Sequence, residues 1–128
     1  MDPERPRVVI ASDHVNAGMQ DNLREGVERE GKFAVVKLSR VKVSRIRQEI
    51  TGAEPDIVLI YASLLNQEEI NELGGFVRRL HKHIPGAKII IYGPTIDADL
   101  QERIGANGWI NEATAYEYLS QELERFKK

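Results

Sequence analysis

The chain has 128 residues, of which 41% are hydrophobic, and this suits one domain with a single core across residues 1–128. Its 18 basic and 20 acidic residues give a net charge of -2, so we expect neither nucleic acid nor a membrane surface as a partner. It has no cysteine, which excludes disulfides, thiolate metal sites and cysteine nucleophiles. No apolar run reaches membrane-spanning length and the first residues do not resemble a signal peptide, so we expect a soluble cytoplasmic protein.

The first part of the chain alternates between apolar runs and helical patterns. Arg7–Ala11 predicts a strand, and Val15–Glu30 predicts a helix that ends at Gly31. Phe33–Leu38 predicts the second strand, and the apolar spacing between Val43 and Ile50 predicts a second helix.

A third apolar run, Ile57–Ile60, lies within the stretch Pro55–Leu65 and is apolar on consecutive residues. A strand with this pattern has both faces buried, which is typical of the middle of a parallel sheet. In such sheets, ligands and partners meet the carboxyl ends of central strands, so we expect function to lie at the end of this strand.

The second part of the chain repeats the alternation. Asn66 is expected to cap a helix over Gln67–His83, whose apolar residues recur every three or four positions. The remaining elements are a strand at Lys88–Tyr92, a helix from the cap Asp97 through Ile104, a strand at Trp109–Ile110 and a helix at Ala113–Phe126. Five such alternations predict an α/β fold with a doubly wound five-stranded parallel sheet, flavodoxin-like strand order 2-1-3-4-5 and three α/β/α layers.

Two segments at strand ends carry a resemblance to a known family. Asp13 and Gly18 fit a D-x-H-x-x-G loop after the first strand, and Gly93 fits the second glycine of a G-G pair after the fourth. With these residues and the stretch Tyr92–Ile110, the chain resembles the cobalamin-binding domain family over residues 8–123. The resemblance implies cobalamin or another tetrapyrrole as a ligand, in a non-catalytic regulatory or sensor domain.

Other positions depart from that family. Val15 stands where the cobalt-binding histidine is expected, and His14 lies one residue earlier. Tyr61 occupies the serine position after the third strand, with Ser63 two residues later, and Tyr92 replaces the first glycine of the pair. In the family, small residues at these points leave a slot for the nucleotide tail of the cofactor. Two tyrosines would fill that slot, so the alternatives are an atypical binding mode or no cofactor at all.

A second resemblance concerns receiver domains of two-component signalling. It rests on Ile10–His14, Pro55–Tyr61 and Gly105–Glu112. The phosphoacceptor position falls on Tyr61, and the family's lysine position falls on Glu112. The resemblance therefore implies a phosphorylation-independent pseudo-receiver that binds a signalling protein.

Aromatic residues gather at the predicted carboxyl ends of the strands. Tyr61, Tyr92 and Trp109 offer rigid faces suited to stacking on a planar ligand or to anchoring a protein partner, and alternatively they plug a cavity. The complete set of candidate ligand-binding residues is Asp13, His14, Gly18, Tyr61, Ser63, Tyr92, Gly93 and Trp109. The strand ends show no nucleophile with a base and an orienting group, so we predict no catalytic residues and no enzyme.

The helix over Gln67–His83 offers two further motifs. His81 and His83 form an H-x-H pair, but the two rings diverge on a helix, so we expect no metal site. Gly74-Gly75 follows no strand and opens no helix, which favours close packing or a bend of the helix over a phosphate loop. We expect a protein partner, and homodimerisation remains open.

Overall fold

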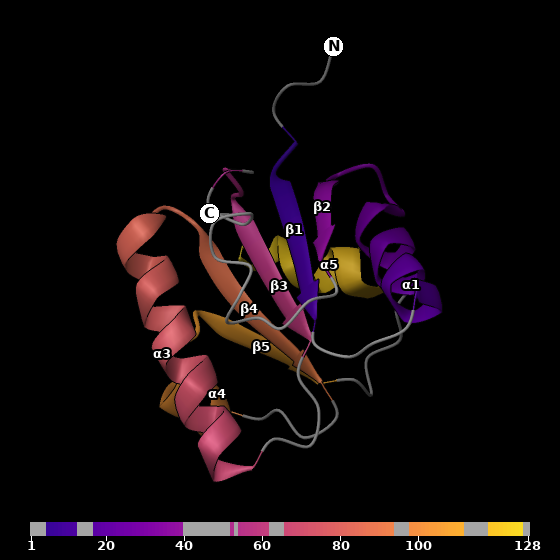
Figure 1. Ribbon diagram of the computed structural model, residues 1–128. Helices are drawn as coiled ribbons and strands as arrows, with labels where there is room; N and C mark the ends of the chain where they lie inside the picture. The colour runs from indigo at the N-terminus through magenta and orange to yellow at the C-terminus, as the bar shows by residue number, and fades with distance from the viewer. Residues whose placement is uncertain are drawn as a thin grey trace.

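The computed structural model describes residues 5–12, 17–39, 52, 54–61, 66–93, 98–111 and 118–126. Five strands form one sheet in the order β2-β1-β3-β4-β5, with every neighbouring pair parallel. The strands are β1 (Arg7–Ser12), β2 (Ala34–Ser39), β3 (Ile57–Tyr61), β4 (Lys88–Gly93) and β5 (Gly108–Asn111). The helices are α1 (Ala17–Glu28), α3 (Gln67–His83), α4 (Ala98–Ile104) and α5 (Leu119–Glu124) (Figure 1).

The predicted fold class and strand order are confirmed. Each observed strand begins and ends within one residue of the predicted run. The helix predicted between Val43 and Ile50 lies outside the described residues. So does the first part of the helix predicted from Ala113, of which the structure describes α5.

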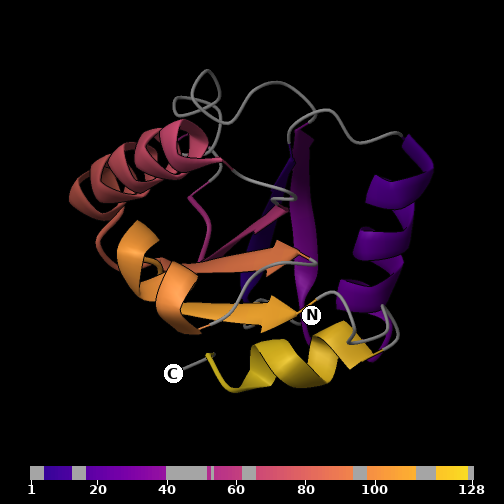
Figure 2. The same cartoon turned by 90° about the horizontal axis from the view of Figure 1, so that it is seen from below.

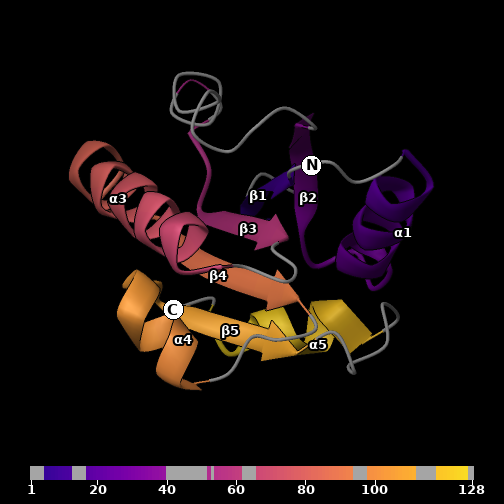
Figure 3. The same cartoon turned by 60° about the horizontal axis from the view of Figure 1, so that its bottom comes forward.

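Helices cover both faces of the sheet. Helices α3 and α4 lie on one face, and α1 and α5 lie on the other (Figures 2 and 3). Within the described residues, no helix combines the length and apolar character needed to cross a membrane.

Alternation along the strands divides the core between these two faces. In β3, Val58 and Ile60 belong to the cluster under α3 and α4, whereas Ile57, Leu59 and Tyr61 belong to the cluster under α1 and α5. All five side chains of β3 are buried. The strand is therefore apolar on consecutive residues because both of its faces contribute to a core.

The start of α3 matches its sequence signal. The Asn66 side chain accepts a hydrogen bond from the Glu69 backbone N–H at 2.8 Å, and the Asn66 N–H donates to Glu69 Oε1 at 3.0 Å. This capping box satisfies two backbone groups that a helix start leaves unpaired. The predicted range Gln67–His83 is the observed one.

The passage from α4 into β5 depends on Gly105, Gln101 and Asn107. Gly105 has φ +86°, a conformation that glycine adopts without steric cost, and its N–H donates to the Gln101 carbonyl at 2.9 Å. Asn107 Oδ1 then accepts from the Ile89 N–H at 2.7 Å, and the Asn107 N–H donates to the Ile89 carbonyl at 2.8 Å. Asn107 thus pairs with β4 directly before β5 begins at Gly108.

Candidate functional site

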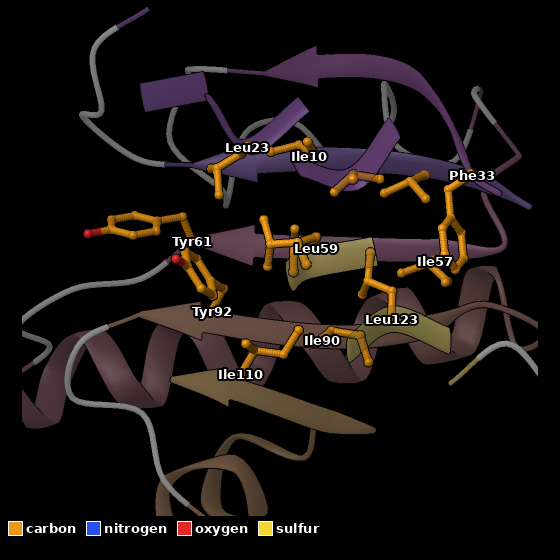
Figure 4. Close-up of a cluster of buried hydrophobic side chains, with 13 residues drawn as sticks. Ile10, Leu23, Phe33, Ile57, Leu59, Tyr61, Ile90, Tyr92, Ile110 and Leu123 are labelled. Atoms are coloured by element: carbon orange, nitrogen blue, oxygen red, sulfur yellow. The ribbon is translucent and has the colours of Figure 1, made fainter. Parts of the chain in front are cut away.

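Tyr61 and Tyr92 form a pair at the carboxyl ends of the two central strands. Tyr61 is the last residue of β3, and the parallel register places it level with Tyr92 of β4. Both side chains point to the face covered by α1 and α5, where their ring centroids lie 5.8 Å apart with a tilt of 54° between the planes (Figure 4). This distance and tilt are typical of a favourable aromatic contact.

The pair is buried although it lies at the edge of the sheet. Tyr61 is 8% exposed and Tyr92 is 1% exposed. They belong to the same core cluster as Leu23 of α1 and Leu119 of α5, and they occupy its carboxyl end, opposite Phe33 (Figure 4). The two phenol rings therefore fill the space between the ends of β3 and β4 and the helices above them.

Trp109 is separated from this pair. It lies level with Ile91, and its side chain is partly buried against the cluster under α3 and α4. Ile110, the next residue, is the one that lies level with Tyr92 on the tyrosine side. The three aromatic residues that the sequence places at one edge thus lie on two faces of the sheet.

Three of the predicted site residues lie outside the described part of the chain, namely Asp13, His14 and Ser63. Gly18 lies in the first turn of α1. Gly93 is buried at the end of β4, level with Asn111 of β5.

Asn111 is a polar residue at this edge that was not among the predicted site residues. It closes β5 level with Gly93 and is partly buried. The sequence could have indicated Asn111, because it directly precedes Glu112, the position at which receiver domains have a lysine.

At this edge β3 ends in Tyr61, β4 ends in Tyr92 and Gly93, and β5 ends in Asn111. Among the residues that the structure describes, no group of three or more His, Asp or Glu side chains could hold a metal ion. His81 Nε2 lies 3.0 Å from the Gly105 carbonyl oxygen, so within the H-x-H pair this ring makes a contact that joins α3 to the turn after α4. The two tyrosine rings are suited to packing within the fold.

No protein-family model matches the chain, and no curated protein matches it. Solved structures do share its fold. A pilus assembly-related protein from Burkholderia pseudomallei has a TM-score of 0.73 at 20% identity, with 94% of this chain and 88% of that chain covered. A cobalamin-binding protein from Desulfitobacterium hafniense has a TM-score of 0.71 at 19% identity, with 96% of this chain but 60% of that chain covered.

The signal receiver domain of the response regulator NarL from Mycobacterium tuberculosis has a TM-score of 0.74 at 14% identity, with 98% of both chains covered. Both resemblances read from the sequence are therefore confirmed at the level of the fold. The chain has the flavodoxin-like fold that cobalamin-binding and receiver domains share.

Proposed function

We propose that this chain is a non-catalytic regulatory domain that acts through contact with a protein partner, without an inserted cofactor and without phosphorylation. The observation that carries the proposal is the buried pair of Tyr61 and Tyr92 at the carboxyl ends of the central strands. In open α/β sheets this edge is where ligands bind. Here the two central strands carry buried phenol rings at that edge.

The pair does not fit a cobalamin tail inserted at this position. A tail that enters between the strand ends needs an open slot, and the two rings, 8% and 1% exposed, belong to the core cluster that the slot would have to cross. The closed edge supports a mode of action that needs no ligand there.

A phosphorylation-independent pseudo-receiver is the second candidate. The observations that favour it are the similarity to a receiver domain across 98% of both chains and the position of Tyr61 at the end of β3. The receiver resemblance places the phosphoacceptor there. A phenol in a packed cluster cannot replace a carboxylate beside a divalent cation, because hard cations prefer several oxygen ligands.

Two titrations test the proposal. Hydroxocobalamin and haem are added to the purified protein while visible spectra are recorded, and acetyl phosphate with Mg²⁺ is added while the intact mass is measured. We expect no spectral shift, no pigment retained on desalting and no added phosphoryl group. A retained pigment would overturn the cofactor-free proposal, and a phosphoryl adduct would overturn both candidates.

The positive test is binding to the products of neighbouring genes, measured by isothermal titration calorimetry. We expect one of these proteins to bind in the absence of cobalamin and of acetyl phosphate. Binding that appears only after either is added would contradict the proposal.

A further inference from the structure

The outward face of α3 carries a segregated charge pattern. Glu68, Glu72, Gly75, Arg79 and Lys82 recur at spacings of three and four, so they form one stripe along the helix. The four charged residues of the stripe are exposed, and the buried residues of α3 lie on the opposite side, against the sheet. The stripe is therefore acidic before Gly75 and basic after it.

The helix dipole does not account for the whole pattern. The dipole favours acidic residues in the first turn and basic residues in the last turn, which covers Glu68 and Lys82. Glu72 and Arg79 lie farther inside the helix. Glu72 has a like charge four residues away at Glu68, and Arg79 has one three residues away at Lys82, and like charges that are neighbours on one helix face destabilise an isolated helix.

Ion pairs among the described residues do not neutralise these charges. Within that part of the chain, no ion pair involves Glu68, Glu72, Arg79 or Lys82. Both halves of the stripe therefore carry charges that can pair with another molecule.

Gly75 lies at the centre of the stripe, and the fold gives no packing reason for it. A Cβ at the neighbouring Gly74 would lie 3.6 Å from the Ile104 carbonyl oxygen, so Gly74 lets α3 approach α4. A Cβ at Gly75 would meet only side-chain ends, Arg79 Nη1 at 3.6 Å and Arg78 Nη2 at 3.8 Å. Since glycine weakens a helix interior relative to alanine, an outward-facing glycine here favours close approach of another backbone from outside.

We propose that the outward face of α3 binds the same face of a second copy of this chain, with the two helices antiparallel and a two-fold axis at Gly75. Glu68 and Lys82 lie equally far from Gly75 along the helix, and Glu72 and Arg79 lie three and four residues from it on either side. The axis therefore places Glu68 opposite the second copy's basic end, at Lys82, and Glu72 close to the second copy's Arg79. Each pair occurs twice by symmetry, and an interface of this kind is self-complementary.

One helix pair is a small interface, so the dimer is weak and sensitive to salt. The inference does not rest on the proposed function, because it involves the helix layer and not the strand ends. A parallel arrangement is excluded by the same charges, since it would set acid against acid and base against base.

Sedimentation velocity with charge variants tests the proposal. We expect the wild-type chain to self-associate at low ionic strength and to dissociate as salt is added. The variants Glu68→Lys/Glu72→Arg and Arg79→Glu/Lys82→Glu each make both halves of the stripe alike in sign, so each should self-associate at least about tenfold more weakly. Mixed together they should form a heterodimer, because every cross-copy pair is then opposite in sign.

A cross-link on the otherwise native surface gives an independent test. The chain has no cysteine, so Gly75→Cys introduces a single thiol at the proposed axis. Glu25→Cys, on the exposed side of α1, is the matched control. We expect Gly75→Cys to form a disulfide dimer on mild oxidation much faster than the control, because a disulfide requires two Cα atoms within about 7 Å.

Three outcomes would overturn the proposal. They are a wild-type chain that stays monomeric up to millimolar concentration, a variant mixture that associates no better than either variant alone, and equal cross-linking rates for the two cysteine variants. Circular dichroism of each charge variant verifies that it is folded. If a charge variant is not folded, the comparison of the Gly75→Cys and Glu25→Cys cross-linking rates tests the proposal instead.

Discussion

Replacement of Tyr92 by alanine should be among the most damaging single changes at the carboxyl edge of the sheet. Tyr92 is 1% exposed and its ring contacts that of Tyr61, which is 8% exposed. Truncation of a fully buried large aromatic side chain removes its burial energy and leaves a cavity, which costs about 3–5 kcal/mol. The free energy of unfolding of an ordinary domain is about 5–15 kcal/mol, so the Tyr92→Ala chain should retain only part of its stability.

Urea unfolding followed by far-ultraviolet circular dichroism measures this loss. Tyr92→Phe retains the ring and should lose much less, and Tyr118→Ala, at a side chain that is 50% exposed, should change the free energy of unfolding by less than about 0.5 kcal/mol. In a double-mutant cycle, Tyr61→Ala and Tyr92→Ala together should cost about 0.5–1.5 kcal/mol less than the sum of the two single changes, because the aromatic contact is lost only once. A loss below about 1 kcal/mol for Tyr92→Ala would refute the reasoning, since the ring would then not fill a packed space.

Three further changes test other parts of the structure. Asn107→Ala should cost about 1–3 kcal/mol in urea unfolding, because it removes the acceptor of the Ile89 N–H at 2.7 Å, and Asn107→Asp, which keeps an oxygen there, should cost less. Gly108→Ala should cost about 1–3 kcal/mol, since its Cβ would overlap the Phe126 ring, and the loss should shrink in a Phe126→Ala background; an unchanged loss there would point to another cause. A hydrogen bond to Glu124 and its charge, together with the charge of Glu30, raise the pKa of Lys32 above its ordinary 10.5. The pairing of Lys32 with these carboxylates therefore stabilises the fold below pH 10.5, and this stabilisation is lost as pH rises through the higher folded-state pKa. The stability difference between wild type and Lys32→Gln should therefore be constant at neutral pH and vanish once the pH has risen through the folded-state pKa of Lys32, and a difference that persists in more alkaline solution would exclude the charge pairing as its source.

Local patterns in the sequence were sufficient for the elements and the sheet order. The consecutive apolar residues of Ile57–Ile60 predicted a strand buried on both faces, and the structure buries all five residues of β3. Asn66 and Glu69 are three residues apart in the chain, so their capping box could be predicted from the local sequence. Alternation of strands and helices then leaves few parallel topologies open.

The site could be predicted only in part, because it depends on register between distant strands. The sequence placed Tyr61, Tyr92 and Trp109 at strand ends but did not show which residues of neighbouring strands lie opposite one another. The hydrogen-bonded pairing of β4 with β5 sets Trp109 beside Ile91 and Ile110 beside Tyr92, and a shift of one residue would have reversed the faces.

Contacts between segments far apart in the chain were also beyond local reasoning. The Phe126 ring lies over Gly108, and the Asn107 side chain pairs with the backbone of Ile89. Both follow from tertiary packing, which no periodicity encodes. The same holds for Gly74, whose packing role was predicted but whose partner, the carboxyl end of α4, became evident only in the structure.

Chemical modification of the tyrosines tests the closed edge most directly. The native protein is treated briefly with tetranitromethane and the nitrated residues are mapped by mass spectrometry, with protein unfolded in urea as the reference. We predict rapid nitration of Tyr118, which is 50% exposed, and protection of Tyr61 and Tyr92, which are 8% and 1% exposed. Nitration of Tyr61 and Tyr92 in the native protein as rapid as that of Tyr118 would show that the edge is open and would contradict the account.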